Sequence, residues 1–464
     1  MSTGPTSLAM DPSPAAASQL LRGRGDLERY FRQGCKQAQE LQVGVEWEKI
    51  GVQRETGFAI PYSGPRGVVA IFDALCKRFD WSLVEWGGHA VALTKGPTSI
   101  TLEPGGQIEL SGWKSTELDG NALELYSHLD EIRQVSEPLG IVWLGLGAQP
   151  FSTAEDIEWV PKERYALMRE SLRNKGELTY SMMKETASVQ ISVDYTDERD
   201  AAEKLRLAMA LTPFLVALFA NSPLYRGRPS GFLSRRAHIW SKTAPERTGV
   251  IEQALRPDFG FAGYVDYALD VPMLFIVRNG RWVSMSGTFR QFLEKGFQGE
   301  RPTLEDWELH LTGIFTEARL KKYIEIRSID CQNAEMGLAA VALIKGLFYD
   351  AVAQKKAWDL TGDVTPEERV RLAEEAPRLG LKTAFAGRTL RASCSRLVDY
   401  AEQGLRRMAL QNLALAEETR YLRPLKEIFT DKKGMNPAET LLARLGKSGA
   451  HDTRLRRVLK HAAI

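Results

Sequence analysis

The chain has 464 residues, of which 44% are hydrophobic and 26% charged, a composition typical of a folded globular protein rather than a disordered or fibrous one. With 61 Lys and Arg against 59 Asp and Glu the net charge is +2, so no overall attraction to nucleic acid or acidic membranes is expected. The four cysteines form no CxxC pair, which argues against a zinc site or disulfide framework and favours a reducing compartment, the cytoplasm.

The first two thirds of the chain mix helical and extended patterns. Residues 1–18 read as a disordered tail. Helices are predicted over 19–39, 67–79, 121–139, 162–175 and 200–221. Strands are predicted over 41–52, 90–94, 99–103, 107–110, 140–146 and 187–195. Asn279-Gly280 between two extended runs predicts a hairpin over 272–285.

The longest apolar run, residues 207–220, is shorter than the roughly 20 residues that span a bilayer, so it predicts a buried helix, with a break at Pro213. After about residue 335 helical patterns dominate, over 336–354, 366–375 and 389–422. Because strands and helices are mixed rather than alternating, we expect an α+β fold. We expect a body over 19–350 that carries any active site, with a helical region over 351–464 packed on it as one structural unit.

Common catalytic motifs are missing from the sequence, which has no GxxxxGK[ST] loop, no HExxH and no GxSxG. Paired carboxylates are more informative. Glu46 and Glu48 lie two apart in an extended run, so they share one face. Their flanking residues Val45, Trp47 and Ile50 are apolar. Carboxylates held on one side repel each other and need a cation or counter-charges.

Further glutamates occur in similar patterns. Glu103 and Glu109 flank Pro-Gly-Gly, and Glu325 precedes Arg327 by two residues. If all five glutamates faced one way, they would supply the oxygen ligands that Mg²⁺ takes together with substrate phosphates. The alternative is the solvated face of an antiparallel sheet, where alternating Glu is ordinary, and the pattern alone favours that alternative.

Three arginines form a second set of candidate site residues. Arg169 lies on a predicted helix, while Arg236 and Arg247 lie in loops rich in Gly, Ser and Pro. Arginine forks suit carboxylates and phosphates, although each residue alone is more commonly a surface ion-pairing group.

Several segments together resemble one family, the glutamate–cysteine ligases of the plant and proteobacterial type. They keep the family's order and spacing from about residue 43 to 350, and they are T-S-I-T-L-E-P-G-G-Q-I-E-L-S-G, A-L-F-A-N-S-P-L, G-F-L-S-R-R-A-H-I-W, R-T-G, Y-V-D-Y-A-L-D-V-P-M and R-L-K-K-Y-I-E-I-R-S. The resemblance implies a curved, largely antiparallel sheet forming a funnel, related to the glutamine synthetase catalytic fold, with helices outside.

The resemblance also implies a set of site residues. Those similar to the family's Mg²⁺ and ATP-phosphate ligands are Glu46, Glu48, Glu103, Glu109, Gln190 and Glu325. Arg169 and Arg236 resemble residues that hold the glutamate carboxylates, Arg327 and Arg247 resemble residues that stabilise transferred phosphate, and Tyr264 and Tyr267 would line the amino-acid pocket. The implied cofactor is Mg²⁺ and the implied substrates are ATP, L-glutamate and L-cysteine, with no nucleic-acid or membrane partner. Monomer and homodimer stay open.

The implied reaction is the first step of glutathione synthesis, in which ATP activates the γ-carboxylate of glutamate as γ-glutamyl phosphate and the cysteine amine displaces the phosphate. Alternatives are a γ-glutamyl ligase for another thiol pathway, of the ergothioneine type, or for another amine, and a non-catalytic amino-acid or nucleotide sensor.

Some positions depart from the family. Trp47 replaces a histidine, Glu185 replaces an arginine, and the segment from Ser328 differs from the plant G-A-D-G-G. These changes leave the amine acceptor open. Ser284 stands where plant members carry a hairpin cysteine of a redox switch, so no such switch is expected.

Overall fold

The centre of the protein is a nine-stranded sheet, seen in a computed structural model that describes residues 19–411, 418–431, 434–446 and 450–464. The predicted tail, 1–18, lies outside these residues. The strand order is β14-β15-β7-β1-β5-β4-β3-β2, and β6 pairs with the end of β1. Its strands are β1 (Val43–Gln53), β2 (Ser82–Trp86), β3 (His89–Lys95), β4 (Thr98–Leu102), β5 (Ile108–Ser111), β6 (Ile141–Leu144), β7 (Ser188–Val193), β14 (Ala318–Leu320) and β15 (Ile324–Asp330). Every pairing in it is antiparallel, which confirms the α+β expectation.

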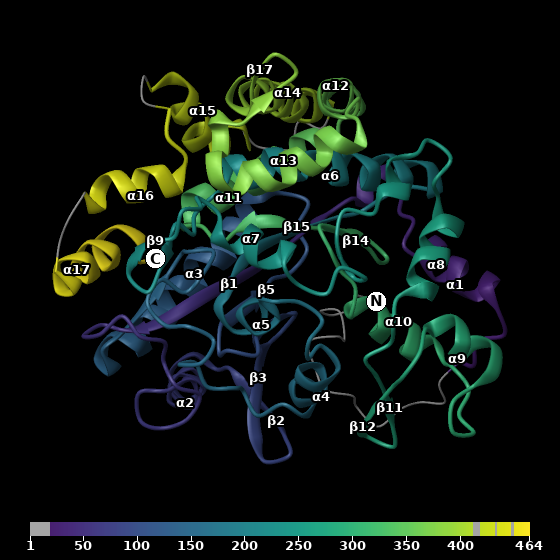
Figure 1. The fold of residues 1–464 in the computed structure, drawn as a ribbon, viewed down its shortest axis with the longest axis horizontal. Helices are drawn as coiled ribbons and strands as arrows, with labels where there is room; N and C mark the ends of the chain where they lie inside the picture. Colours follow the sequence, from purple (N-terminus) through teal and green to yellow (C-terminus); the bar gives the residue numbers. More distant parts are fainter. Residues whose placement is uncertain (1–18, 412–417, 432–433, 447–449) are drawn as a thin grey trace.

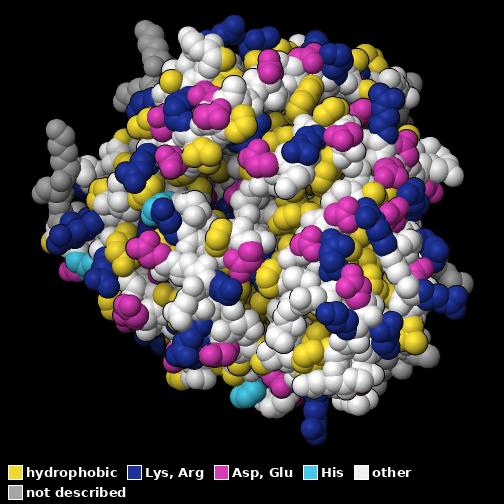
Figure 2. Space-filling model, turned by 45° about the vertical axis from the view of Figure 1, so that its right-hand side comes forward, with side chains coloured by type: hydrophobic (Ala, Val, Ile, Leu, Met, Phe, Trp, Pro, Cys, Tyr) yellow, Lys and Arg dark blue, Asp and Glu magenta, His cyan; other side chains and the backbone are white. Residues whose placement is uncertain are grey.

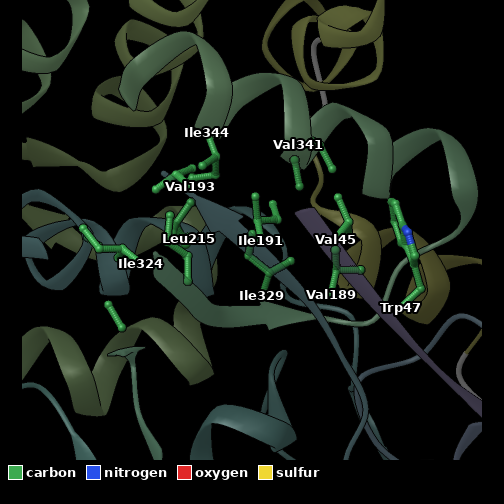
Figure 3. Packing of buried hydrophobic residues seen from close by; sticks show 14 of the residues in the cluster. Val45, Trp47, Val189, Ile191, Val193, Leu215, Ile324, Ile329, Val341 and Ile344 are labelled. Carbon is green, nitrogen blue, oxygen red and sulfur yellow. The ribbon is translucent and has the colours of Figure 1, made fainter. Parts of the chain in front are cut away.

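Alternation along the strands gives the sheet one apolar and one polar face. Figure 3 shows Val341 and Ile344 of a helix packed over the apolar face, against side chains that include Val45, Trp47, Val189, Ile191 and Val193. Burying each such side chain contributes about 1.5–3 kcal/mol. The packing is close, since a Cβ at Gly337 would lie 2.5 Å from the Trp47 ring.

The helices form two layers over the apolar face (Figure 1). The inner layer touches the strands, and the outer layer packs on two of its helices, α6 (Glu198–Leu218) and α11 (Ala334–Phe348). The inner helices are α2 (Val68–Phe79), α3 (Leu118–Ser136), α6 (Glu198–Leu218) and α11 (Ala334–Phe348). The outer helices are α12 (Ala351–Thr361), α13 (Pro366–Leu379), α14 (Leu390–Gln411) and α15 (Arg423–Thr430).

Other elements surround the polar face and the sheet edges. The helices are α1 (Arg24–Arg32), α4 (Glu163–Ser171), α5 (Thr179–Glu185), α7 (Arg235–Ser241), α8 (Phe261–Asp270), α9 (Phe289–Lys295), α10 (Leu304–Thr312), α16 (Pro437–Leu445) and α17 (His451–Ala462). Short strands are β8 (Leu224–Tyr225), β9 (Arg228–Pro229), β10 (Thr248–Gly249), β11 (Phe275–Arg278), β12 (Arg281–Ser284), β13 (Phe315–Thr316), β16 (Ala384–Phe385) and β17 (Arg388–Thr389). The β11–β12 hairpin confirms its prediction: Asn279 and Gly280 both have positive φ, 50° and 71°.

Three helix predictions were wrong in detail. The predicted break at Pro213 does not occur, because burial of α6 under the outer helices outweighs the missing N–H. The predicted helix over 336–354 is two helices, α11 and α12, bent by 98°, since Asp350 caps a new helix by accepting from Ala353 N. The helix predicted over 19–39 is limited to α1, which ends shortly before Gly34, where the chain passes against Tyr195 and Lys322 with no room for a Cβ.

The C-terminal part is attached to the body by buried polar contacts. Lys345 Nζ of α11 lies 2.6 Å from a Glu418 carboxylate oxygen, and Ile464 N donates to Trp143 O at 3.0 Å. Of the helix predicted over 389–422, α14 ends at Gln411, residues 412–417 lie outside the described ones, and 418–422 form a short 3₁₀ helix.

Within the described ranges, no single helix is long and apolar enough to cross a membrane. The bent α11–α12 pair passes this test by length and composition alone, and α11 is largely buried. Figure 2 shows acidic and basic side chains interspersed over one face of the molecule.

Candidate active site

A cavity of about 1450 Å³ opens on the polar face of the sheet. One side of it is formed by β1, β4, β5 and β7, and the other sides by α4, α7, α10 and the β11–β12 hairpin. Seven of the twelve predicted site residues line it, namely Glu46, Glu48, Glu103, Glu109, Gln190, Arg236 and Arg327. The polar face of the sheet is therefore the wall of a cavity, and not the solvated outer surface that the pattern alone favoured.

Carboxylates form an acidic wall of the cavity. Oxygens of Glu48, Glu103 and Glu109 lie within 4.8 Å of one another, a grouping found by searching the described residues. Glu48 and Glu109 are direct cross-strand partners of β1 and β5, and Glu103 reaches them from the turn after β4. That turn packs tightly: a Cβ at Gly105 would lie 2.5 Å from Lys184 O, so glycine is required there.

The acidic wall is electrostatically unfavourable when it has no cation. Burial and the neighbouring Glu48 raise the pKa of Glu103 to about 7, and burial and Glu103 raise that of Glu109 to about 7. Burial, together with Glu109 and Glu325, raises the pKa of Glu46 to about 8. A hard divalent cation relieves such crowding by neutralising the carboxylates and replacing their protons. The donor chemistry of these residues therefore fits Mg²⁺.

Hydrogen bonds fix the orientation of two of these carboxylates. Glu48 accepts from Ser188 N at 2.5 Å and from Gln190 Nε2 at 2.9 Å. Glu109 accepts from Thr101 Oγ1 at 3.1 Å and Ser111 Oγ at 2.9 Å. Preorganised oxygens lose little entropy when they take up a metal ion.

A basic wall lies beside the acidic one, where β14 and β15 run along the sheet edge. Glu325 is fully buried, with its oxygens 2.5 Å from Arg319, 3.5 Å from Lys321 and 3.4 Å from Arg327. Burial opposes ionisation of Glu325, but these three cations outweigh it and hold its pKa well below the usual range. Glu325 is thus a counter-ion beneath the basic wall in this structure, while the three cations line the cavity.

Arg319 and Lys321 are cavity residues that the sequence analysis did not assign. Burial and the adjacent Arg319 lower the pKa of Lys321 to about 8. Lys162 and Arg164 also line the cavity, from the start of α4. A signal was present in R-L-K-K-Y-I-E-I-R, where alternate residues 319, 321, 325 and 327 are charged, but it does not show which partner each side chain meets.

A β-bulge places Arg327. In the β15–β7 ladder Ile326 pairs with Ile191 and Ile329 with Val189, so β15 carries one extra residue between them. Bulges re-aim side chains and occur next to active sites. Here the Arg327 side chain donates to Gln190 Oε1, and the amide nitrogen of the same glutamine donates to Glu48. The acidic and basic walls are joined through this glutamine.

The remaining four predicted residues lie elsewhere: within the described chain, the cavity lining does not include Arg169, Arg247, Tyr264 or Tyr267. Arg169 is exposed, with its guanidinium 5.3 Å from the Trp159 ring. Tyr264 is buried, and its hydroxyl accepts from Leu320 N at 3.1 Å. The ring of Tyr267 packs beside it, with the two ring centroids 6.0 Å apart. The positions of these three residues give no support to the implied substrate contacts.

Arg247 has the surroundings of a structural residue. It is 2% exposed and donates to the carbonyl oxygens of Gly313 at 2.8 Å and Pro272 at 2.7 Å. We expect Arg247→Met to lower the free energy of unfolding by about 3 kcal/mol, because two buried carbonyl groups lose a charged donor. Urea denaturation measures this. An unchanged free energy of unfolding together with a loss of turnover would instead indicate that Arg247 takes part in the reaction.

Two departures from the family pattern are also placed by the structure. Trp47 points to the helical face of the sheet, away from the cavity. Glu185 is 1% exposed and pairs with Arg235 at 2.6 Å. Neither lines the cavity, so neither contacts a molecule bound there. The four cysteines, all within the described residues, are free thiols.

Comparisons with known proteins show what this chain is similar to. A family profile described as "Glutamate-cysteine ligase family 2" matches residues 42–461. The chloroplastic glutamate–cysteine ligase of Brassica juncea is 41% identical over 423 residues, covering 90% of this chain and 80% of that protein. Its Arabidopsis thaliana counterpart is 40% identical over 423 residues, covering 90% and 79%. The crystal structure of a glutamate–cysteine ligase from Francisella tularensis in complex with AMP has a TM-score of 0.55 at 13% identity, covering 90% of this chain and 88% of that one, which shows a shared fold.

Proposed function

The chain belongs to the glutamate–cysteine ligase family 2, and from this membership we propose that it joins the γ-carboxylate of L-glutamate to the amino group of L-cysteine at the expense of ATP, the first step of glutathione biosynthesis. The observation that carries the proposal is the cavity itself. It brings three clustered carboxylates and two arginines, Arg236 and Arg327, to one place in a chain similar to these enzymes.

The chemistry requires an activated carboxylate. A γ-carboxylate oxygen of glutamate attacks the γ-phosphorus of ATP, the bond to the bridging oxygen breaks, and ADP leaves. The cysteine nitrogen then attacks the acyl carbon of γ-glutamyl phosphate, inorganic phosphate leaves, and the nitrogen loses a proton. Neither step needs a nucleophilic side chain, so the protein's contribution is positioning and charge neutralisation.

The two walls suit these tasks. Glu48, Glu103 and Glu109 would hold Mg²⁺, with Glu46 beside them, and the ion would neutralise phosphate oxygens when bound. Arg327, oriented by Gln190, presents a guanidinium to the transferred phosphoryl group. Arg236 donates to Arg327 O at 2.7 Å and would hold a glutamate carboxylate. Arg319 and Lys321 add positive charge for the same anions.

A sensor and a γ-glutamyl ligase for another amine would each give a different result in an assay of ADP release and product mass. We propose cysteine as the acceptor because the similar curated proteins are named glutamate–cysteine ligases, and the similarity extends over most of their length. The decisive assay mixes protein, ATP, Mg²⁺ and glutamate with cysteine or one other amine, and follows ADP release and product mass. ADP release with the γ-glutamylcysteine mass is expected. Release with another amine would change the acceptor, and no release with any amine would leave a sensor.

Binding of Mg²⁺ is expected to tighten at least about tenfold between pH 6 and pH 8. The pKa values of Glu103 and Glu109 are both raised to about 7, so at pH 6 each is mostly protonated and must lose its proton before it can coordinate an ion. Calorimetric MgCl₂ titrations in two buffers of different ionisation enthalpy would measure affinity and proton release together. An affinity that stays flat over this range would argue against these ligands.

We also propose that the protein acts in the cytoplasm, since its four cysteines are unpaired, as expected of a reducing compartment. The similar curated proteins from plants carry "chloroplastic" in their names. Fractionation of cells that express the chain would test the proposal.

A further inference from the structure

A second, much smaller cavity of about 10 Å³ lies behind the basic wall. It is lined from α7 by Arg236 and Trp240, from β15 by Arg327 and Ser328, and from α6 and β13 by neighbouring residues. The volume corresponds to about one water molecule, since a single probe sphere of roughly 10–15 Å³ suffices to hold one. The cavity sits at the bulge of β15, where Arg327 and Ser328 leave the regular ladder.

Three residues that line this cavity carry buried polar atoms with no hydrogen-bond partner among the described residues. These atoms are Arg236 Nε, Trp240 Nε1 and Ser328 Oγ. Two are obligate donors and one is a hydroxyl that donates or accepts. More than about nine in ten buried polar groups in proteins form a hydrogen bond with protein or with ordered water. Three unpaired polar atoms around one small cavity therefore point to a shared ligand.

We infer that one buried water molecule binds in this cavity, bridges Arg236, Trp240 and Ser328, and fixes the orientation of the Arg236 guanidinium. Its oxygen would accept from the two N–H groups and one of its O–H groups would donate to the Ser328 hydroxyl oxygen, within the two to four partners that a buried water usually has. The guanidinium is already held on one edge, where Nη2 donates to Arg327 O at 2.7 Å. The water would hold its Nε edge, so the Arg236 fork would present its remaining N–H groups to the large cavity.

This inference makes Trp240 and Ser328 positioning residues, and it rests on the proposed role of Arg236 in holding glutamate. Trp240→Phe removes the N–H and keeps an aromatic ring, while Ser328→Ala removes the hydroxyl. We expect each variant to raise the KM for glutamate about fivefold at nearly unchanged kcat, because each loses a bridging hydrogen bond to a charged group. The double variant should be little worse than either single variant, because both act through the same water.

Trp307→Phe is the matched control. The Trp307 side chain is fully buried, and its Nε1 also has no partner within the described residues, but it packs between Phe31 and Phe289, outside both cavities. It should leave the KM for glutamate unchanged. Multiplicative effects of the two single variants, or an equal KM change in the control, would overturn the bridging role.

A crystal structure at better than about 2 Å tests the water independently of activity. Density for one water within hydrogen-bond distance of all three atoms is expected in the wild type. In Ser328→Ala the water should be absent, or should contact only the two remaining atoms. An empty cavity in the wild type would overturn the inference even if the ligase assay succeeds. If the water is present but the KM for glutamate does not respond in any variant, the role of Arg236 in substrate binding fails instead.

Discussion

Replacing Glu103 with glutamine is expected to lower kcat/KM about a hundredfold while leaving the fold intact. The carboxylate sits in the cluster with Glu48 and Glu109, and its loss removes a charged oxygen ligand from the proposed Mg²⁺ site. Losing about 3 kcal/mol of transition-state charge stabilisation corresponds to that factor. Steady-state ADP release at increasing Mg²⁺ measures it, and the Mg²⁺ concentration for half-maximal rate should rise as well.

Stability is expected to move in the opposite direction in the same variant. The raised pKa of Glu103 means that its ionised form is less favourable in the folded chain than in the unfolded one. Above pH 7 and without metal, the neutral amide removes that cost, so the melting temperature should stay constant or rise. A variant that loses activity by unfolding would contradict this expectation.

Glu124→Gln provides the comparison for Glu103→Gln. Glu124 is also partly buried, but it lies outside the cavity and accepts from the Trp113 N–H and the Thr98 hydroxyl. The Glu124 variant should lose some stability and keep the Mg²⁺ dependence of the wild type. If the Glu103 variant turns over as fast as the Glu124 variant, Glu103 is not a ligand of the proposed metal site.

Replacing Arg327 with methionine is expected to lower kcat by about two to three orders of magnitude, the usual cost of removing one preorganised donor to a developing negative charge. Arg327→Lys should recover part of that loss, since it keeps the charge but not the planar fork. The fold should tolerate both changes, because Glu325 keeps Arg319 at 2.5 Å and Lys321 at 3.5 Å as counter-charges.

Single-turnover measurement of γ-glutamyl phosphate formation would show where the Arg327 variants fail. A slow first step with normal glutamate binding is expected. Arg206→Met is a suitable control, because Arg206 is a partly buried arginine stacked 4.3 Å from the Trp358 ring, on the opposite side of the sheet. Normal phosphoryl transfer in Arg327→Met would refute the role proposed for Arg327.

Much of the site could be predicted from the sequence because it depends on local geometry. The two-residue period of β1 put Glu46 and Glu48 on one face, and the structure keeps them there. The Asn279-Gly280 hairpin also follows from local backbone preferences. Residue patterns had singled out Glu103, Glu109, Arg236 and Arg327, and family resemblance gave them roles and added Gln190. These five residues reach the same cavity from five different elements or turns.

Long-range packing decided what the sequence left open. Alternation in β1 cannot distinguish a solvated face from a cavity wall, and α4, α10 and the hairpin make that difference by covering the polar face. Burial makes Arg247 a donor to main-chain carbonyls. It makes Glu325 a counter-ion, although Glu325 shares its motif with the cavity residues Arg319 and Arg327. Strand period and turn type are properties of a few neighbouring residues, whereas the partner of a buried charge depends on distant segments, so only the tertiary structure assigned it.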